Sequence, residues 1–142
     1  MANRHFYLRL NCTYRGPQND IDDLTVDTAK DDAWEKLHLD TRSPGFLLFI
    51  NGLFSCQHLY LRTNCAERNL LIESATGELQ VLTNEVWRIQ SAKVSFDVKL
   101  KSGLPTQDDI DYIIDRMGHC PVSTNLADGI ELVKTLNFDR AE

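Results

Sequence analysis

The sequence predicts an α+β fold: a small antiparallel strand meander, a long buried helix, a second strand pair, another helix and a C-terminal strand. Three observations predict it: alternation of apolar and polar residues over 6–14, an apolar stretch that begins at Ser43 and Pro44, and renewed alternation over 86–100. A period of two residues indicates a strand, whereas apolar positions spaced three and four apart indicate a helix. This order of elements contains few parallel crossovers, which is typical of the α+β class.

The N-terminal third is predicted to be the meander. Residues 6–14 form a half-buried strand, because one side of the alternation holds Phe6, Leu8, Leu10, Cys12 and Tyr14. Cys12 is on that apolar side, where a thiol usually serves as a small buried hydrophobe. Residues 15–20 make a turn, and two short strands follow at 24–27 and 34–39. The acidic residues between these strands are expected to form solvated loops.

A long helix is predicted from Ser43 to Arg68. Ser43 is expected to cap its first turn, Pro44 to occupy the first helical position, and Asn69 to end it. Its first half is apolar nearly all round, so we expect it to be buried on most sides. One small sheet cannot cover such a helix, which favours a homodimer whose second subunit completes the core.

The remaining elements follow from local signals. Extended segments are predicted at 70–82 and 86–100, and Gly103-Leu104-Pro105 interrupts the chain after them. Thr106 and Asp109 have the spacing of a helix-capping pair. The helix buries one face, made of Ile110, Ile113, Ile114 and Met117, and ends at Gly118. A short helical turn near Cys120 and a strand over 130–138 complete the chain, which we treat as a single domain spanning residues 1–142.

Composition excludes several classes of protein. The 142 residues (16.2 kDa) are 42% hydrophobic and 25% charged, which is ordinary for a globular domain and unlike a disordered or coiled-coil chain. The longest apolar run, 46–50, is far too short to span a membrane, and no signal-peptide block follows Met1. We therefore expect a soluble, cytoplasmic protein. The net charge of −6 and the lack of a basic run argue against nucleic acid or an anionic membrane as a partner.

Four cysteines are the first candidates for chemistry. A cytoplasmic location keeps thiols reduced, and no pair has the C-x-x-C spacing, so we expect neither a structural disulfide framework nor a metal site. Cys120 stands where a helical turn begins: either helix N–H groups stabilise its thiolate, or it simply caps a turn. Cys56 lies where the long helix changes from apolar to polar and is either inert packing or a reactive group at the floor of a cleft. Cys65 is expected to be an incidental surface or semi-buried thiol.

Two histidines neighbour these thiols in the sequence. His58 and His119 are each close to a candidate cysteine along the chain. Residues one or two apart on a helix point in different directions, so neighbours in sequence do not become a catalytic pair. A Cys-His hydrolase is therefore disfavoured.

Two motifs resemble a known family. The segment Ser43-Pro44-Gly45-Phe46-Leu47-Leu48, followed by Gly52-Leu53-Phe54-Ser55-Cys56, resembles the start of the central helix in OsmC-like proteins, the osmotically induced and organic hydroperoxide resistance group. His119-Cys120-Pro121-Val122-Ser123 resembles the second cysteine motif of that family. The separation of the two cysteines, 120 − 56 = 64 residues, also suits it. By pattern the resemblance covers about residues 43–138.

The resemblance implies a thiol peroxidase of the antioxidant, oxidative stress response type, with an OsmC-like fold and an intertwined homodimer. It would make Cys56 the peroxidatic cysteine, which becomes a sulfenic acid, and Cys120 the resolving cysteine, which condenses with it to a disulfide. An external dithiol reductant, small or protein, would then reset the pair, and no cofactor is implied. The family pattern also includes an arginine from the N-terminal strands, for which Arg15 is the first candidate and Arg42 the second.

One family position differs. A glutamate early in the central helix holds the arginine in OsmC-like proteins, and the matching residue here is Phe46. Two functions therefore compete. In the first, Cys56 and Cys120 reduce a hydroperoxide, organic or hydrogen peroxide. In the alternative, a weak or inactive relative binds a hydrophobic small molecule in the cleft between subunits, which Phe46 and the apolar helix favour. The retained cysteine pair favours the enzyme.

Overall fold

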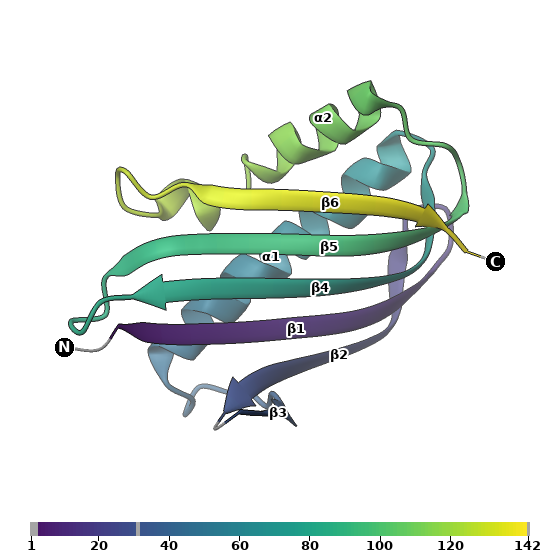
Figure 1. The fold of residues 1–142 in the computed structure, drawn as a ribbon. Coiled ribbons are helices and arrows are strands. Elements are labelled where there is room, and N and C mark those ends of the chain that lie inside the picture. Colours follow the sequence, from purple (N-terminus) through teal and green to yellow (C-terminus); the bar gives the residue numbers. More distant parts are fainter. Residues whose placement is uncertain (1–2, 31, 142) are drawn as a thin grey trace.

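The computed structural model describes residues 3–30 and 32–141, and in them six strands form one sheet with the order β3-β2-β1-β4-β5-β6 (Figure 1). β5 and β6 pair in parallel, and the other neighbours pair antiparallel. The α+β prediction is thus confirmed. The strands are β1 (Arg4–Arg15), β2 (Asp20–Lys30), β3 (Ala33–Lys36), β4 (Leu71–Thr83), β5 (Ile89–Ser102) and β6 (Leu132–Arg140).

Two helices cover one face of this sheet. α1 (Gly45–Glu67) crosses behind it diagonally in Figure 1, and α2 (Gln107–Met117) packs beside α1 near the β6 edge. A short 3₁₀ turn, η1 (Ser123–Asn125), precedes β6. Neither helix in the described ranges combines the length and hydropathy that a membrane crossing requires.

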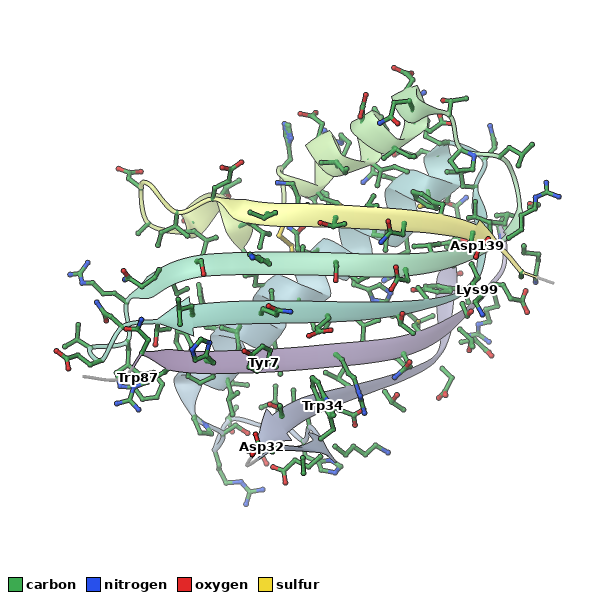
Figure 2. All side chains as sticks on the ribbon, viewed as in Figure 1. Tyr7, Asp32, Trp34, Trp87, Lys99 and Asp139 are labelled. Carbon is green, nitrogen blue, oxygen red and sulfur yellow. A yellow bond between two sulfur atoms is a disulfide. The ribbon has the colours of Figure 1, made fainter. Side chains whose placement is uncertain are left out.

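Alternation along the strands separates the two faces of the sheet. In β1 four of the five side chains predicted on the inner side are buried and Phe6 is half-buried, whereas the intervening ones are more exposed (Leu8, Leu10, Cys12 and Tyr14 are the buried set). Figure 2 shows the opposite face, from which Tyr7, Trp34, Lys99 and Asp139 project. The hydrophobic core therefore lies between the sheet and α1, and any chemistry that involves α1 is on this side of the sheet.

Two local predictions in the first third of the chain are wrong. The acidic stretch is not a loop: β2 starts at Asp20, inside the expected turn, because its carboxylates can point to water from the outer face while the backbone pairs with β1. Asp27, for example, accepts from Arg9 at 3.4 Å across the strand pair. Asp31 lies outside the described residues. β3 ends at Lys36, short of the predicted residue 39.

The caps of the helices are partly as expected. Thr106 and Asp109 form the predicted capping box of α2, with reciprocal hydrogen bonds of 3.1 and 2.9 Å. Ser43 does not cap α1, because its hydroxyl accepts from the Asp40 backbone N–H at 2.9 Å instead, and Pro44 stands at the cap. At the other end Asn69 adopts a left-handed φ of 60°, one residue beyond the Arg68 cap.

One side of α1 is open in the single chain. Leu48, Phe49 and Leu59 are 38%, 38% and 42% exposed, although we expected a helix buried on most sides. The sheet and α2 cover the rest of the helix, including Ile50, Leu53, Phe54 and Leu61. The homodimer that would cover this open side stays a prediction.

Candidate active site

Cys56 and Cys120 form a disulfide between α1 and the segment that follows α2. Their Cα atoms are 6.1 Å apart, which is within the usual range for a bridged pair. Cys56 lies near the middle of α1, and Cys120 is reached only after both long strands and α2 have been traversed. Residues far apart in sequence are thus brought together by the packing of α2 on α1.

The two sulfurs are not equally accessible. Cys120 is fully buried, whereas Cys56 is half-buried, on a helix with one open side. Gly52, one helical turn before Cys56, has open space beside it: a Cβ added there would meet no atom within 4 Å. A small oxidant from solvent therefore has a route to Cys56 and not to Cys120.

Cys120 does not stand at the start of a helix, contrary to the prediction. α2 ends at Met117, and η1 begins three residues after the cysteine. The Cys120 N–H donates to Met117 O at 3.3 Å, and its carbonyl oxygen accepts from Thr124 N at 3.0 Å. A three-residue turn has little dipole, so stabilisation of a thiolate by a helix N-terminus does not apply to Cys120.

The other two cysteines are buried and poorly suited to nucleophilic attack. Cys12 lies on the inner face of β1, as expected, and burial is the main cause that raises the pKa of its thiol. Cys65 is fully buried, which contradicts our expectation of a surface or semi-buried thiol. It lies two turns after His58, on the helix side that faces the sheet. Burial raises the pKa of Cys65 to about 12. At neutral pH both remain protonated, and a thiol is a weak nucleophile.

His58 is turned away from Cys56. Its Nε2 shares a buried hydrogen bond of 2.6 Å with the Tyr14 hydroxyl, and its ring stacks on Phe96 with centroids 6.0 Å apart. Burial, with a contribution from the positive charge of Arg62, lowers the pKa of His58 to about 4. His119 is exposed. Neither histidine pairs with a thiol in the described structure.

Gln57 is a polar residue of this region that sequence reasoning missed. Its side chain is fully buried, and Nε2 donates to Met117 O at 2.8 Å, the same oxygen that accepts from Cys120 N–H. Its Oε1 has no hydrogen-bond partner among the described residues. The available signal was a glutamine inside an apolar stretch of a helix predicted to be buried.

The arginine candidates lie away from the disulfide within one chain. Arg15 ends β1 and is exposed, and strand alternation turns it to the side opposite Tyr14, the residue that contacts α1. Arg42 precedes α1 and pairs with Asp40 at 2.8 Å in solvent. The assignment of either arginine to the site stays a prediction.

Phe46 belongs to an aromatic cluster and not to the surroundings of Cys56. Its ring lies 4.9 Å from Phe6 and 5.6 Å from Trp87, centroid to centroid. Ten residues of helix separate it from Cys56, about 15 Å along the axis. Two cavities of about 590 and 370 Å³ adjoin this cluster, and Phe46 and Trp87 line both.

Comparison with known proteins rests on structure alone. No family model matches the chain, and no curated protein does either. Among solved structures, a hypothetical protein from Aquifex aeolicus VF5 superposes with a TM-score of 0.58 at 9% identity, covering 94% of this chain and 96% of that one. An OsmC-like hydroperoxide resistance protein from Jannaschia sp. CCS1 superposes with a TM-score of 0.55 at 18% identity, covering 86% of each chain.

A third solved structure gives the same result. An OsmC-like protein from Mycoplasma pneumoniae superposes with a TM-score of 0.53 at 11% identity, covering 80% of this chain and 88% of that one. Each of these matches spans most of this chain and most of the other. Taken with the cysteine motifs, they establish that this protein has the OsmC-like fold.

Proposed function

We propose that this protein is a thiol peroxidase that reduces organic hydroperoxides with Cys56 and Cys120. The observation that carries the proposal is the disulfide itself: of four cysteines, the pair that is bonded is the pair with one accessible and one buried sulfur. A purely structural disulfide is rare in a reducing compartment, whereas a transient one is the product expected of peroxidase chemistry. The hydroperoxide resistance protein of the same fold adds support.

The reaction has two steps, each balanced. The Cys56 thiolate attacks the outer oxygen of ROOH, the O–O bond breaks, and the products are Cys56 sulfenic acid and an alkoxide that takes up a proton to give ROH. The Cys120 thiol then condenses with the sulfenic acid, so that the S–S bond forms and water leaves. A dithiol supplies the two electrons and two protons that restore both thiols.

The accessibility of the two sulfurs assigns their roles in this proposal. Cys56 is the group that an oxidant can reach, next to the open space over Gly52. Cys120 is shielded from the oxidant, and its sulfur is close enough to bond to Cys56, which is what a resolving thiol requires. We further propose that the enzyme is a homodimer and that Arg15 or, second, Arg42 of one subunit approaches Cys56 of the other.

Titration of reduced protein with cumene hydroperoxide tests the proposal. A slight excess should consume two thiols per chain and leave a disulfide that peptide mapping assigns to Cys56 and Cys120. Cys56→Ser should abolish peroxide consumption, and Cys120→Ser should leave a sulfenic acid at Cys56 that a dimedone probe traps. Cys65→Ser is the matched control on the same helix and should behave as the unmodified protein. Loss of the thiol at Cys12 or Cys65 instead would overturn the proposal.

A second function is favoured by the aromatic cluster. The two cavities that adjoin Phe46 and Trp87 would accept an apolar small molecule, in line with a protein that binds a ligand and does not turn it over. Titration with cumyl alcohol, the product of cumene hydroperoxide reduction, should change the fluorescence of Trp87. The signal should survive in Trp34→Phe and disappear in Trp87→Phe. Ligand binding without peroxide consumption would favour this second function over the first.

A further inference from the structure

Gln57 connects α1 to the segment that carries Cys120. It is adjacent to Cys56 in the sequence, and its Nε2 donates to Met117 O at 2.8 Å in a fully buried environment. Met117 is the last residue of α2, and the same oxygen accepts from the Cys120 N–H at 3.3 Å. One carbonyl therefore receives a hydrogen bond from the helix of Cys56 and another from the backbone of Cys120.

The other half of the Gln57 amide is unsatisfied. Its Oε1 is buried and has no partner within the described part of the chain, in a protein whose disulfide is closed. A buried acceptor without a partner destabilises a fold, and an apolar residue of the same shape would avoid that penalty. A glutamine at this position is therefore more than packing.

Opening the disulfide changes what this region needs. The covalent bond that holds Cys120 opposite Cys56 is then gone, and only the exposed residues Gly118 and His119 separate Cys120 from α2. The reduced Cys120 also carries a hydrogen on a buried sulfur, and a thiol is a weak donor that needs an acceptor. Gln57 offers both a hydrogen bond to the end of α2, from Nε2, and a buried acceptor without a partner among the described residues, Oε1.

We propose that Gln57 is the positioning residue that keeps Cys120 opposite Cys56 when the disulfide is open: Nε2 fixes the end of α2 through Met117 O, and Oε1 accepts from the Cys120 thiol. This rests on the proposed function for its role in turnover. Gln57 affects the condensation of the Cys56 sulfenic acid with the Cys120 thiol, which releases water, and not the preceding attack on the peroxide.

A redox equilibrium tests the positioning without any peroxide. Protein dithiol and oxidised dithiothreitol exchange to protein disulfide and reduced dithiothreitol, and the constant reports the free energy of the disulfide form relative to the dithiol form. Gln57→Met keeps the volume and removes the amide. Because Oε1 has no partner in the disulfide form and accepts from the Cys120 thiol only in the dithiol form, the constant should rise about tenfold when that hydrogen bond is lost. Gln80→Met, at an exposed glutamine on the outer face of the sheet, is the matched control and should leave it unchanged.

Two further variants separate positioning from packing. Gln57→Asn keeps an amide that is one methylene too short to accept from the thiol, and should also raise the constant. Gln57→Glu, when its carboxylic acid is protonated, again offers one donor and one acceptor, so its constant should approach that of the unmodified protein at low pH. The constant should fall as the acid ionises, because a carboxylate accepts from the thiol more strongly than an amide does. An unchanged or lower constant in Gln57→Met, or a Gln57→Glu constant that does not change with pH relative to that of the unmodified protein, would overturn the proposal.

Peroxide then measures the consequence for turnover. In Gln57→Met the dimedone-trapped fraction of Cys56 should rise several-fold, while the rate constant for the first attack on cumene hydroperoxide stays that of the unmodified protein. A fall in the first rate alone would contradict the assignment to the second step. If the unmodified protein consumes no peroxide, the proposed function fails, and the dithiothreitol equilibrium still decides the role of Gln57.

Discussion

The Tyr14 hydroxyl lies 2.6 Å from Nε2 of His58. This buried hydrogen bond joins β1 to the side of α1 that packs on the sheet. Burial is the first cause that lowers the pKa of His58 to about 4, followed by the charge of Arg62. The imidazole is therefore neutral in the folded protein at all pH values well above 4.

Stability should depend on pH through His58. In the unfolded chain histidine has a pKa of about 6.5, so below that value the unfolded state binds a proton that the folded state still rejects. Stability should thus be full above pH 6.5 and be lost as the pH falls toward 4. Between pH 7.5 and 5.0 the free energy of unfolding should drop by about 2 kcal/mol in urea titrations. His58→Leu should flatten this dependence, and an equally steep loss in that variant would contradict the assignment.

The open side of α1 should be covered by a second copy of the chain. Sedimentation at micromolar concentration should give about twice 16.2 kDa, because Leu48, Phe49 and Leu59 form exposed apolar surface on one helix. Leu59→Glu should shift the protein to a monomer. Leu104→Glu, at a 72% exposed leucine in the loop before α2, is the control and should leave the dimer intact. A well-folded monomer of the unmodified chain would refute the dimer.

Phe46→Glu should not accelerate peroxide reduction. A carboxylate there could hold an arginine over the thiolate, but Phe46 contacts Phe6, and Arg15 is nine residues further along β1, about 30 Å away. Arg42 already pairs with Asp40. The variant should instead lose roughly 1–3 kcal/mol of stability with its aromatic contacts. Stopped-flow oxidation should show slow turnover in both proteins, faster with cumene hydroperoxide than with hydrogen peroxide. A faster variant would mean that a partner subunit's arginine reaches position 46.

The oxidised protein should be more stable than the reduced one. A crosslink between residues 64 apart restricts the unfolded chain and should add roughly 2–4 kcal/mol to the free energy of unfolding. Urea titrations with and without dithiothreitol measure the difference. Cys56→Ser should unfold at the same urea concentration in both conditions. The same response to dithiothreitol in that variant would show that another thiol pair is responsible.

Much of the fold could be predicted because its signals are local. Alternation over 6–14 identifies the buried face of β1, and Thr106 with Asp109 identifies the start of α2. The predictions that are wrong depend on pairing and packing that a single segment does not show. Asp20 joins a strand because it pairs with Arg15 across the turn between β1 and β2. Cys65 is buried because the sheet lies beneath that side of α1.

The candidate site shows the same division. The resemblance to a family identified the cysteine pair, and no spacing rule in the sequence would have joined residues 56 and 120. Gln57 could not be assigned, because its role depends on the end of α2 meeting α1, sixty residues away in sequence. The geometry also changes the interpretation of Phe46: the sequence places it ten residues from Cys56, and a helix turns that separation into about 15 Å.

The parallel pairing of β6 with β5 has a consequence for protein synthesis. Cys120 lies in the connection that crosses over between these strands, so the 64 residues from Cys56 to Cys120 must be made before the disulfide can close. At about 5–20 residues per second this takes roughly 3–13 s, during which Cys56 is on the ribosome without its partner. A sulfenic acid formed on a nascent chain has no second thiol to condense with and is open to irreversible oxidation. During oxidative stress, newly made chains are therefore more vulnerable than finished ones.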